Sequence, residues 1–260
     1  MTGLQAVILG IVEGITEFLP VSSTGHMILA GSLMKIQDNE FVKTFEIAIQ
    51  LGAIAAVMLL YVRRFLREPR LYLILAIAFV PTGIAGLLFY KYIKALLFNP
   101  VSVSLALIAG GVILLFFDRL AARNEHKPAG HETEVSPKNA FIIGLFQTIS
   151  MIPGVSRAAA TIGGGLAVGL NRVRAVEFSF LLAVPTMVVA TGYDLYKNRA
   201  SLNSAHLDVL AIGGIVAFAT ALIAVRFFVG FISKRGFFAF GIYRIAAGIG
   251  FLVYFWGRGF

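Results

Sequence analysis

Long apolar segments recur along the chain and restrict it to a membrane-spanning fold. Crossing a bilayer takes roughly 20 apolar residues, and six segments are long enough: about residues 45–62, 71–89, 101–117, 177–195, 207–229 and 237–256. Only 13% of the residues are charged, whereas a soluble domain has about 25%. Lipid offers no partner to backbone N–H and C=O groups, so each span is predicted to be an α-helix. The sequence therefore predicts an all-α integral membrane protein.

Two further apolar regions are interrupted near their middles. Residues 4–36 are broken at 20–25, and residues 139–170 are broken at Pro153 and Gly154. Irregular backbone at membrane depth is tolerated only where it is buried in protein or faces water. We therefore expect two re-entrant helical hairpins. Two ordinary spans kinked at proline are the alternative.

The two broken regions resemble each other, and the same order of elements follows each. Aligning Gly10 with Gly144 places Glu13 on Gln147, and three spans follow in each half. Because three is odd, the second half enters the membrane from the opposite side. This predicts an inverted-topology repeat, which places a substrate site near the midplane at broken helices. The chain is then a single membrane domain, 1–260, with a first repeat at 1–117, a cytoplasmic linker at 118–138 and a second repeat at 139–256.

Basic residues predict the orientation. The 63–70 and 118–140 loops are richer in Arg and Lys than the loops on the opposite side, and the richer side is expected to be cytoplasmic. Both termini then lie outside, and the hairpins enter from opposite faces so that their tips meet. The net charge of +9 also favours contact with anionic membrane lipids. No basic stripe interleaved with aromatics points to nucleic acid.

The first broken region carries an unusual set of polar residues. Glu13 and Glu17 are four apart and share one helical face, although each ionisable group at membrane depth costs about 2.5–3.5 kcal/mol. Paired carboxylates can hold Mg²⁺ or Ca²⁺ together with phosphate. Hydroxyl and imidazole groups offer a nucleophile and a proton-transfer group. These groups belong to Ser22, Ser23, Thr24 and His26.

The second broken region carries residues suited to an anion. Gly154, Ser156, Arg157 and Thr161 lie at or just after its break. The guanidinium fork of Arg matches phosphate oxygens, and backbone N–H groups at a helix start favour anions. The two regions together predict a site for a phosphate or diphosphate whose remainder lies in lipid. The absence of cysteine excludes thiolate catalysis.

Two other arginines lie within predicted spans. Arg226 and Arg244 are interpreted as snorkelling or helix-pairing residues.

At these residues the chain resembles a known family. Residues 13–26, EGITEFLPVSSTGH, resemble the first signature of the bacterial undecaprenyl-diphosphate phosphatases, the bacitracin-resistance family. Residues 153–157, PGVSR, with Thr161 downstream, resemble its second signature, and residues 177–185, EFSFLLAVP, are also similar to the family. The resemblance covers essentially the whole chain. Ala158 and Ala159 stand where the family usually has Ser-Gly, so no catalytic role is assigned to position 158.

The resemblance implies a multi-pass enzyme of the bacterial cytoplasmic membrane with its active site open to the outer face. It implies hydrolysis of undecaprenyl diphosphate to undecaprenyl phosphate and inorganic phosphate. This reaction recycles the lipid carrier for cell-wall synthesis and confers bacitracin resistance. The resemblance also implies a divalent cation, which we expect at Glu13 and Glu17. The positions that match the family's working residues are Glu13, Glu17, Ser23, His26 and Arg157.

Several alternatives stay open at this point. An inverted-repeat transporter or flippase for a lipid phosphate or anion is the second functional hypothesis, although the hydroxyl and His cluster favours an enzyme. Ser23 is the preferred nucleophile with His26, three residues away, handling its proton; attack by His26, or by a water that it activates, is the alternative. We expect substrate contacts from Ser22, Thr24, Gly154, Ser156 and Thr161. The metal, the prenyl chain length and a homodimer are left open.

Overall fold

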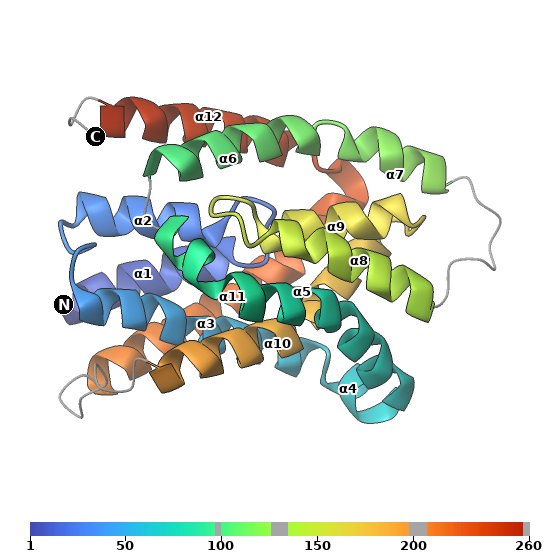
Figure 1. Ribbon diagram of the computed structural model, residues 1–260, viewed down its shortest axis with the longest axis horizontal. Helices are drawn as coiled ribbons and strands as arrows, with labels where there is room; N and C mark the ends of the chain where they lie inside the picture. Colours follow the sequence, from blue (N-terminus) through green and yellow to red (C-terminus); the bar gives the residue numbers. More distant parts are fainter. Residues whose placement is uncertain (97–99, 126–134, 198–206, 257–260) are drawn as a thin grey trace.

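The computed structural model describes residues 1–96, 100–125, 135–197 and 207–256, and these residues contain helices and no strands. Most helices run roughly along the long axis of the molecule (Figure 1). In chain order the helices are α1 (Gly3–Thr16), α2 (Ser23–Leu33), α3 (Glu40–Leu60), α4 (Val62–Arg67), α5 (Pro69–Leu96), α6 (Pro100–Leu114), α7 (Phe117–Glu125), α8 (Pro137–Ile149), α9 (Arg157–Ala167), α10 (Arg172–Lys197), α11 (Leu207–Arg235) and α12 (Phe238–Trp256). The prediction of an all-α membrane protein is confirmed.

The six predicted spans are also confirmed, with wider bounds in most cases. The segments long and apolar enough to cross a membrane are Glu40–Leu60, Pro69–Phe89, Val101–Asn124, Arg172–Lys197, Leu207–Arg235 and Phe238–Phe255. Polar caps, which hydropathy does not detect, account for two of the earlier starts. Asn39 accepts a hydrogen bond from the N–H of Phe41 before α3, and Asn171 accepts one from Arg174 before α10. Such caps satisfy N–H groups that the first helical turn leaves free.

The third span is divided into two helices. α6 ends at Leu114 and α7 begins at Phe117. Asp118, in the first turn of α7, accepts hydrogen bonds from the N–H groups of Phe237 and Phe238 at the start of α12 and also pairs with Arg172. The break therefore places a carboxylate at the N-terminus of another helix, where an anion is favoured.

Each broken apolar region forms a pair of short helices joined by an irregular turn. α1 packs against α2, and α8 packs against α9. The first pair resumes within the predicted break at 20–25, because Ser23 and Thr24 already belong to α2; in the second pair, α9 begins at Arg157, just after the break at Pro153 and Gly154. Whether these pairs are re-entrant stays a prediction. Of the predicted 118–138 linker, residues 126–134 lie outside the described residues.

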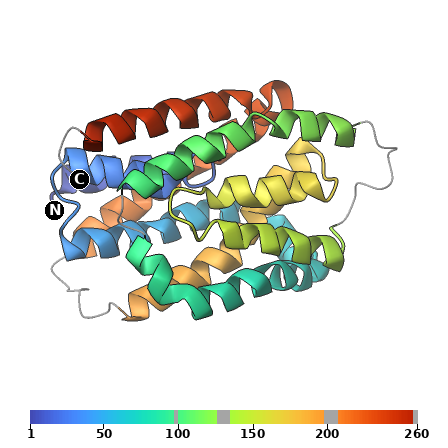
Figure 2. The same cartoon turned by 45° about the horizontal axis from the view of Figure 1, so that its top comes forward.

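The helices of the two halves exchange partners. α1 packs on α11 while α8 packs on α5, and α3 contacts α10. α6 and α12 lie side by side along one edge of the molecule in both views (Figure 1, Figure 2). Glycines allow the close approaches: a Cβ at Gly10 would lie 2.8 Å from the carbonyl oxygen of Gly213 in α11. The inverted repeat and its boundaries stay predictions, but this exchange is the packing that such a repeat would produce.

Candidate active site

The turns of the two helix pairs meet around a small polar cavity of about 160 Å³. The first turn and the start of α2 contribute Glu17, Ser22, Ser23 and Thr24. The second turn and the start of α9 contribute Ser150, Val155, Ser156 and Arg157, and Gln50 and Met187 complete the lining from α3 and α10. The sequence separates the two sets by about 130 residues, so this cavity exists only in the folded chain.

Glu17 links the two turns. Its Oε2 accepts a hydrogen bond from the Ser23 hydroxyl at 2.6 Å, and its Oε1 accepts one from Arg157 Nη2 at 3.0 Å. The carboxylate is only 8% exposed, and a buried carboxylate needs such partners to stay charged. The guanidinium supplies the counter-charge, and the carboxylate in turn orients the Ser23 oxygen.

Arg157 is held on several sides. Its Nη1 donates to the backbone carbonyl of Ser179 at 3.1 Å, and Nη2 also contacts Met187 Sδ at 3.5 Å. The guanidinium carbon lies 5.6 Å from the centre of the Phe18 ring, within the range of a cation–π contact. Its Nε has no partner among the described residues. One buried N–H donor of Arg157 is therefore left without a partner.

Ser22 has an uncommon backbone conformation. Its φ is 71°, in the left-handed region that favours glycine. Strain of this kind is typical of residues held at functional sites. The conformation directs the Ser22 carbonyl to the ring of His26, which donates to it from Nδ1 at 2.8 Å.

His26 faces α12. A carbonyl oxygen can only accept, so Nδ1 carries the proton and the other ring nitrogen of a neutral His26 is an acceptor. That nitrogen, Nε2, lies 2.6 Å from the hydroxyl of Tyr243, and the two ring planes differ by only 9°. His26 does not line the polar cavity. Among the described residues, no hydrogen bond joins it to Ser23, whose hydroxyl donates to Glu17 instead.

Glu13 lies beneath the cavity, within α1. It is 1% exposed, and its Oε1 has no hydrogen-bond partner within the described part of the chain. The charges of Glu17, Glu46 and Arg157 act on it. An unpartnered buried carboxylate oxygen next to a second carboxylate fits a divalent cation. The described residues contain no group of three or more His, Asp or Glu that could hold one, so the protein would supply at most two carboxylates at this position.

Arg244 of α12 joins the two turns from behind. Its Nη1 donates to the carbonyl of Pro20 and its Nη2 to the carbonyl of Gly154, both at 3.0 Å. Its Nε and Nη2 also donate to the carbonyls of Leu107 and Ala106 in α6. The side chain is completely buried. Arg244 is therefore a helix-pairing residue, as one of the two interpretations had it, and it is not a snorkelling one.

The remaining predicted site residues divide into two groups. Ser22, Thr24 and Ser156 line the cavity, and Ser156 also caps α9 by accepting from the N–H of Ala159 at 3.1 Å. Gly154 and Thr161 do not line it. The φ of Gly154 is 88°, and the Thr161 hydroxyl shares a 2.6 Å hydrogen bond with Ser179 in the buried α9–α10 contact, where it supports the residue whose carbonyl holds Arg157.

Sequence reasoning did not predict Gln50, Ser150, Met187 or Tyr243 as site residues. Gln50, Met187 and Tyr243 are isolated side chains within apolar helices, and no spacing links them to either broken region. Ser150 lies inside the second broken region but ahead of its turn, at the end of α8. The similarity between the two broken regions pointed to one further polar residue, because Gln147 aligns with Glu13. Gln147 is completely buried and donates to the hydroxyls of Thr82 and Thr186.

A larger apolar cavity lies next to the polar one. Its volume is about 580 Å³, and Gln50 lines both cavities. Side chains of α3, α5 and α10 form its walls, among them Ile47, Phe79, Leu87 and Val189. A polar chamber beside an apolar one suits an amphiphilic molecule with a small charged head.

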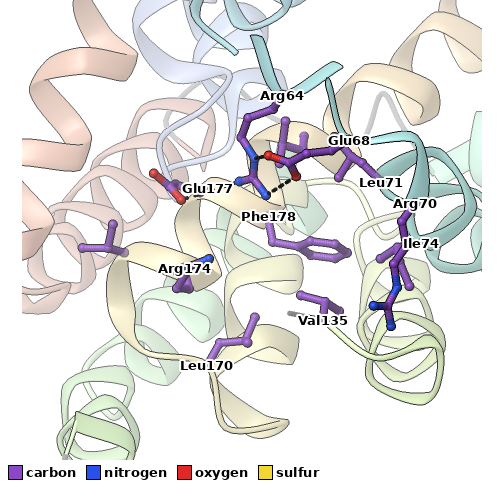
Figure 3. A pocket seen from close by; sticks show the side chains of 12 residues that line it. Arg64, Glu68, Arg70, Leu71, Ile74, Val135, Leu170, Arg174, Glu177 and Phe178 are labelled. Carbon is purple, nitrogen blue, oxygen red and sulfur yellow. Dashed lines mark hydrogen bonds and ion pairs between the residues drawn. The ribbon is translucent and has the colours of Figure 1, made fainter. Parts of the chain in front are cut away.

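A third cavity, of about 690 Å³, lies where α4, α5 and α10 begin or end (Figure 3). Arg64 donates to both carboxylate oxygens of Glu68 at 3.0 Å and lies 3.8 Å from Glu177. The hydrogen bond to Glu68 raises the pKa of Arg64 above its ordinary value. This cavity therefore holds charges of both signs, because Arg70 and Arg174 line it as well.

Known proteins similar to this chain match it over nearly its whole length. The sequence pattern of the family described as "Bacitracin resistance protein BacA" matches residues 6–250. A protein of Wolinella succinogenes named "Undecaprenyl-diphosphatase" is 54% identical over 250 residues, 96% of this chain and 97% of that protein. Proteins with the same name from Sulfurihydrogenibium sp. and Aquifex aeolicus are 51% and 49% identical, each over 98% of this chain and over 100% and 99% of their own lengths.

Proposed function

We propose, because the chain belongs to the bacitracin resistance protein family, that it is a membrane phosphatase that hydrolyses undecaprenyl diphosphate to undecaprenyl phosphate and inorganic phosphate. Relatives that are about half identical over nearly their full lengths carry the name of this activity. The reaction recycles the lipid carrier used in cell-wall synthesis and confers resistance to bacitracin. The same names favour this function over the transporter alternative.

The observation that carries the proposal is the contact of Glu17 with both Ser23 and Arg157. A carboxylate at 2.6 Å from a serine hydroxyl can accept its proton, and an arginine beside it can bind the phosphate oxygens that gain charge. Such a pairing of a nucleophile with a base and a cationic group is the arrangement needed for attack on phosphorus.

In the proposed reaction the Ser23 oxygen attacks the terminal phosphorus. Glu17 takes the serine proton, and the bond between that phosphorus and the bridging oxygen breaks, so that undecaprenyl phosphate leaves. Water then hydrolyses the phosphoserine, which releases inorganic phosphate and returns the proton to the serine oxygen. In the alternative, Ser23 only positions a water that attacks directly. The position of His26, directed to Tyr243 and Ser22, favours Glu17 over His26 as the group that receives the serine proton.

Arg157 would stabilise the charge that develops on the transferred phosphoryl group. Phosphoryl transfer depends mainly on positioning and on electrostatic stabilisation of the equatorial oxygens. The free Nε–H donor of Arg157 and the N-terminus of α9, which Arg157 begins, provide donors for those oxygens.

A divalent cation, Mg²⁺ or Ca²⁺, would be held by Glu13 and Glu17 together with the diphosphate. Mg²⁺ is commonly bound by one or two carboxylates with substrate phosphates and water as the remaining ligands, and the unpartnered Oε1 of Glu13 fits that role. When bound, the cation would neutralise negative charge on the diphosphate.

The two adjoining cavities suit the two parts of the substrate. A water molecule occupies about 30 Å³, so the polar cavity of about 160 Å³ holds a phosphate group and little more. The neighbouring apolar cavity would receive the first isoprene units. We place the enzyme in the bacterial cytoplasmic membrane with the polar cavity accessible from the outer face, as the resemblance to the family implies.

The test is phosphate release by the full chain purified in detergent, with undecaprenyl diphosphate as substrate. Wild-type protein should release inorganic phosphate, and Glu17→Gln should lose at least about 100-fold in kcat, since general base catalysis contributes on the order of 100- to 10,000-fold. EDTA should abolish release, and added Mg²⁺ or Ca²⁺ should restore it. Wild-type protein that moves the lipid across vesicles without releasing phosphate would contradict the proposal in favour of a carrier. Full turnover in EDTA would contradict only the cation.

A further inference from the structure

A groove of about 800 Å³ lies on the outer surface where α11 ends and α12 begins, away from the catalytic cavity. Phe227, Phe231 and Phe238 form apolar walls, and Phe227 and Phe238 are 63% and 57% exposed. Gly230 leaves the middle of the groove open, because a Cβ at this position would meet no atom within 4 Å. The groove is therefore shaped for a ligand with an apolar part.

Three basic side chains line the same groove: Arg226, Lys234 and Arg235. No Asp or Glu is part of its lining, and within the described chain none of the three forms an ion pair. Asp118, which lies against the adjacent turn, is occupied by the N–H groups of Phe237 and Phe238 and by Arg172. The cavity of Figure 3 differs, because carboxylates face its Arg64.

The basic residues extend along the helix from its end into the span. Arg226, Gly230 and Lys234 are successive i, i+4 positions and so lie on one face of α11. Eight residues correspond to about 12 Å along a helix, so Arg226 lies deeper in the membrane than Lys234. An exposed arginine at that depth is unfavourable unless it reaches water or an anion.

We propose that this groove binds one anionic phospholipid, with its phosphate group between Arg226 and Lys234 and an acyl chain against the phenylalanines. Charge complementarity identifies the ligand, because the groove offers cations without acids and an apolar wall that a free phosphate would not use. Basic pockets between transmembrane helices are known sites for anionic lipid head groups. The groove lies at the end of the molecule predicted to face the cytoplasm.

The experiment is native mass spectrometry of the full chain in detergent, with dioleoylphosphatidylglycerol or dioleoylphosphatidylcholine added. Wild-type protein should bind the anionic lipid more tightly than the zwitterionic one. The double variant Arg226→Gln with Lys234→Gln should lower the affinity for the anionic lipid by about tenfold or more and leave the affinity for the zwitterionic lipid unchanged. The variant Gly230→Leu, which fills the groove without changing its charge, should also lower the affinity for the anionic lipid.

The matched control is Arg63→Gln with Arg67→Gln, which removes two exposed charges from α4 at the same end of the molecule. It should keep wild-type affinity for both lipids. Unchanged binding of the anionic lipid by the double variant would overturn the site. An equal loss in the control would show attraction to overall charge and would also overturn it. Phosphate release by each variant in detergent should match wild type, which shows that the fold is intact.

Discussion

Glu17 is a buried carboxylate whose two oxygens contact groups of different charge. It accepts from a neutral hydroxyl with one oxygen and from a guanidinium with the other. In phosphoryl transfer the same carboxylate could accept the proton of Ser23 while Arg157 turns toward the phosphate. In the proposed reaction, the chemistry at the residue scale would therefore depend on how these three side chains share charge.

Arg157→Lys tests whether the planar fork of arginine is needed. Lysine keeps the positive charge but cannot contact the Ser179 carbonyl, Glu17 and a phosphate oxygen together. We expect kcat to fall by about 100-fold, as for the loss of one transition-state donor, while KM changes much less. Steady-state kinetics in detergent measure both constants. A lysine variant with wild-type kcat would show that a point charge is sufficient.

Ser23→Ala and His26→Ala distinguish the candidate nucleophiles. If Ser23 attacks and Glu17 receives its proton, Ser23→Ala should lower kcat by about 1,000-fold or more, and adding Glu17→Gln should lower it little further, because the pair acts as a unit. The check is single-turnover phosphate release. Substantial turnover in Ser23→Ala together with an inactive His26→Ala would transfer the role of nucleophile to His26.

The sequence predicted part of this site. Glu17, Ser23 and Arg157 could be predicted because each belongs to a broken region whose polar residues stand out from apolar surroundings. Tyr243 and Arg244 could not be found in that way. A single tyrosine or arginine in an apolar helix has no partner at a fixed spacing, and the partners of Arg244 are carbonyl groups up to 224 positions away.

At the scale of elements, the pair α6–α12 supports the two turns. Arg244 passes from α12 across α6, and Gly110 in α6 leaves the space that its guanidinium occupies, since a Cβ at position 110 would overlap Arg244 Nη2. The four carbonyls that Arg244 contacts belong to α6 and to both turns. Packing of these two helices therefore sets the distance between the turns.

Gly110→Ala should disturb both stability and activity. The added methyl displaces Arg244, and overpacking of a buried contact destabilises a protein by about 1–3 kcal/mol. We expect a lower Tm and a lower kcat than wild type. Gly250→Ala in α12 is the control, because its Cβ would meet nothing within 4 Å and should leave both quantities unchanged or raise the Tm. A Gly110→Ala protein indistinguishable from Gly250→Ala would refute this role of the contact.

Hydropathy located every spanning helix but not the ends of most of them. The starts of α3 and α10 depend on Asn39 and Asn171, whose single hydrogen bonds carry no hydropathy signal. The break between α6 and α7 was missed because residues 115 and 116 are as apolar as their neighbours. The turns of the broken regions were found, because proline and glycine mark them directly.

At the scale of the whole molecule, the basic residues gather at one end. α4, the end of α7 and the start of α8 lie at the end opposite the start of α1 (Figure 1). The prediction that this end is cytoplasmic follows from the preference of Arg and Lys for that side. If the two halves form the predicted inverted repeat, the odd number of spans in each half would bring the two turns to the same cavity from opposite sides of the membrane.

Cysteine labelling can test the orientation, since the chain has no cysteine of its own. Asp38 and Arg67 flank α3 and are both exposed, so single cysteines at these positions should lie on opposite faces. In intact cells an impermeant maleimide should label Asp38→Cys and not Arg67→Cys, and both should react after the cells are opened. Labelling of position 67 from outside would reverse the predicted orientation.

Arg244 also has a consequence for when the protein becomes active during its synthesis. The ribosome synthesises both turns of the cavity before it synthesises α12. The carbonyls of Pro20 and Gly154 therefore exist before Arg244, the side chain that donates to both of them. Until α12 has inserted beside α6, the pair of Glu17 with Arg157 can join the two turns, but the second link, from Arg244 to the carbonyls of Pro20 and Gly154, is missing. We therefore expect a growing chain to carry its reactive groups in the membrane for most of its translation without the full set of contacts around the site, and to gain full activity only after the last helix described has inserted.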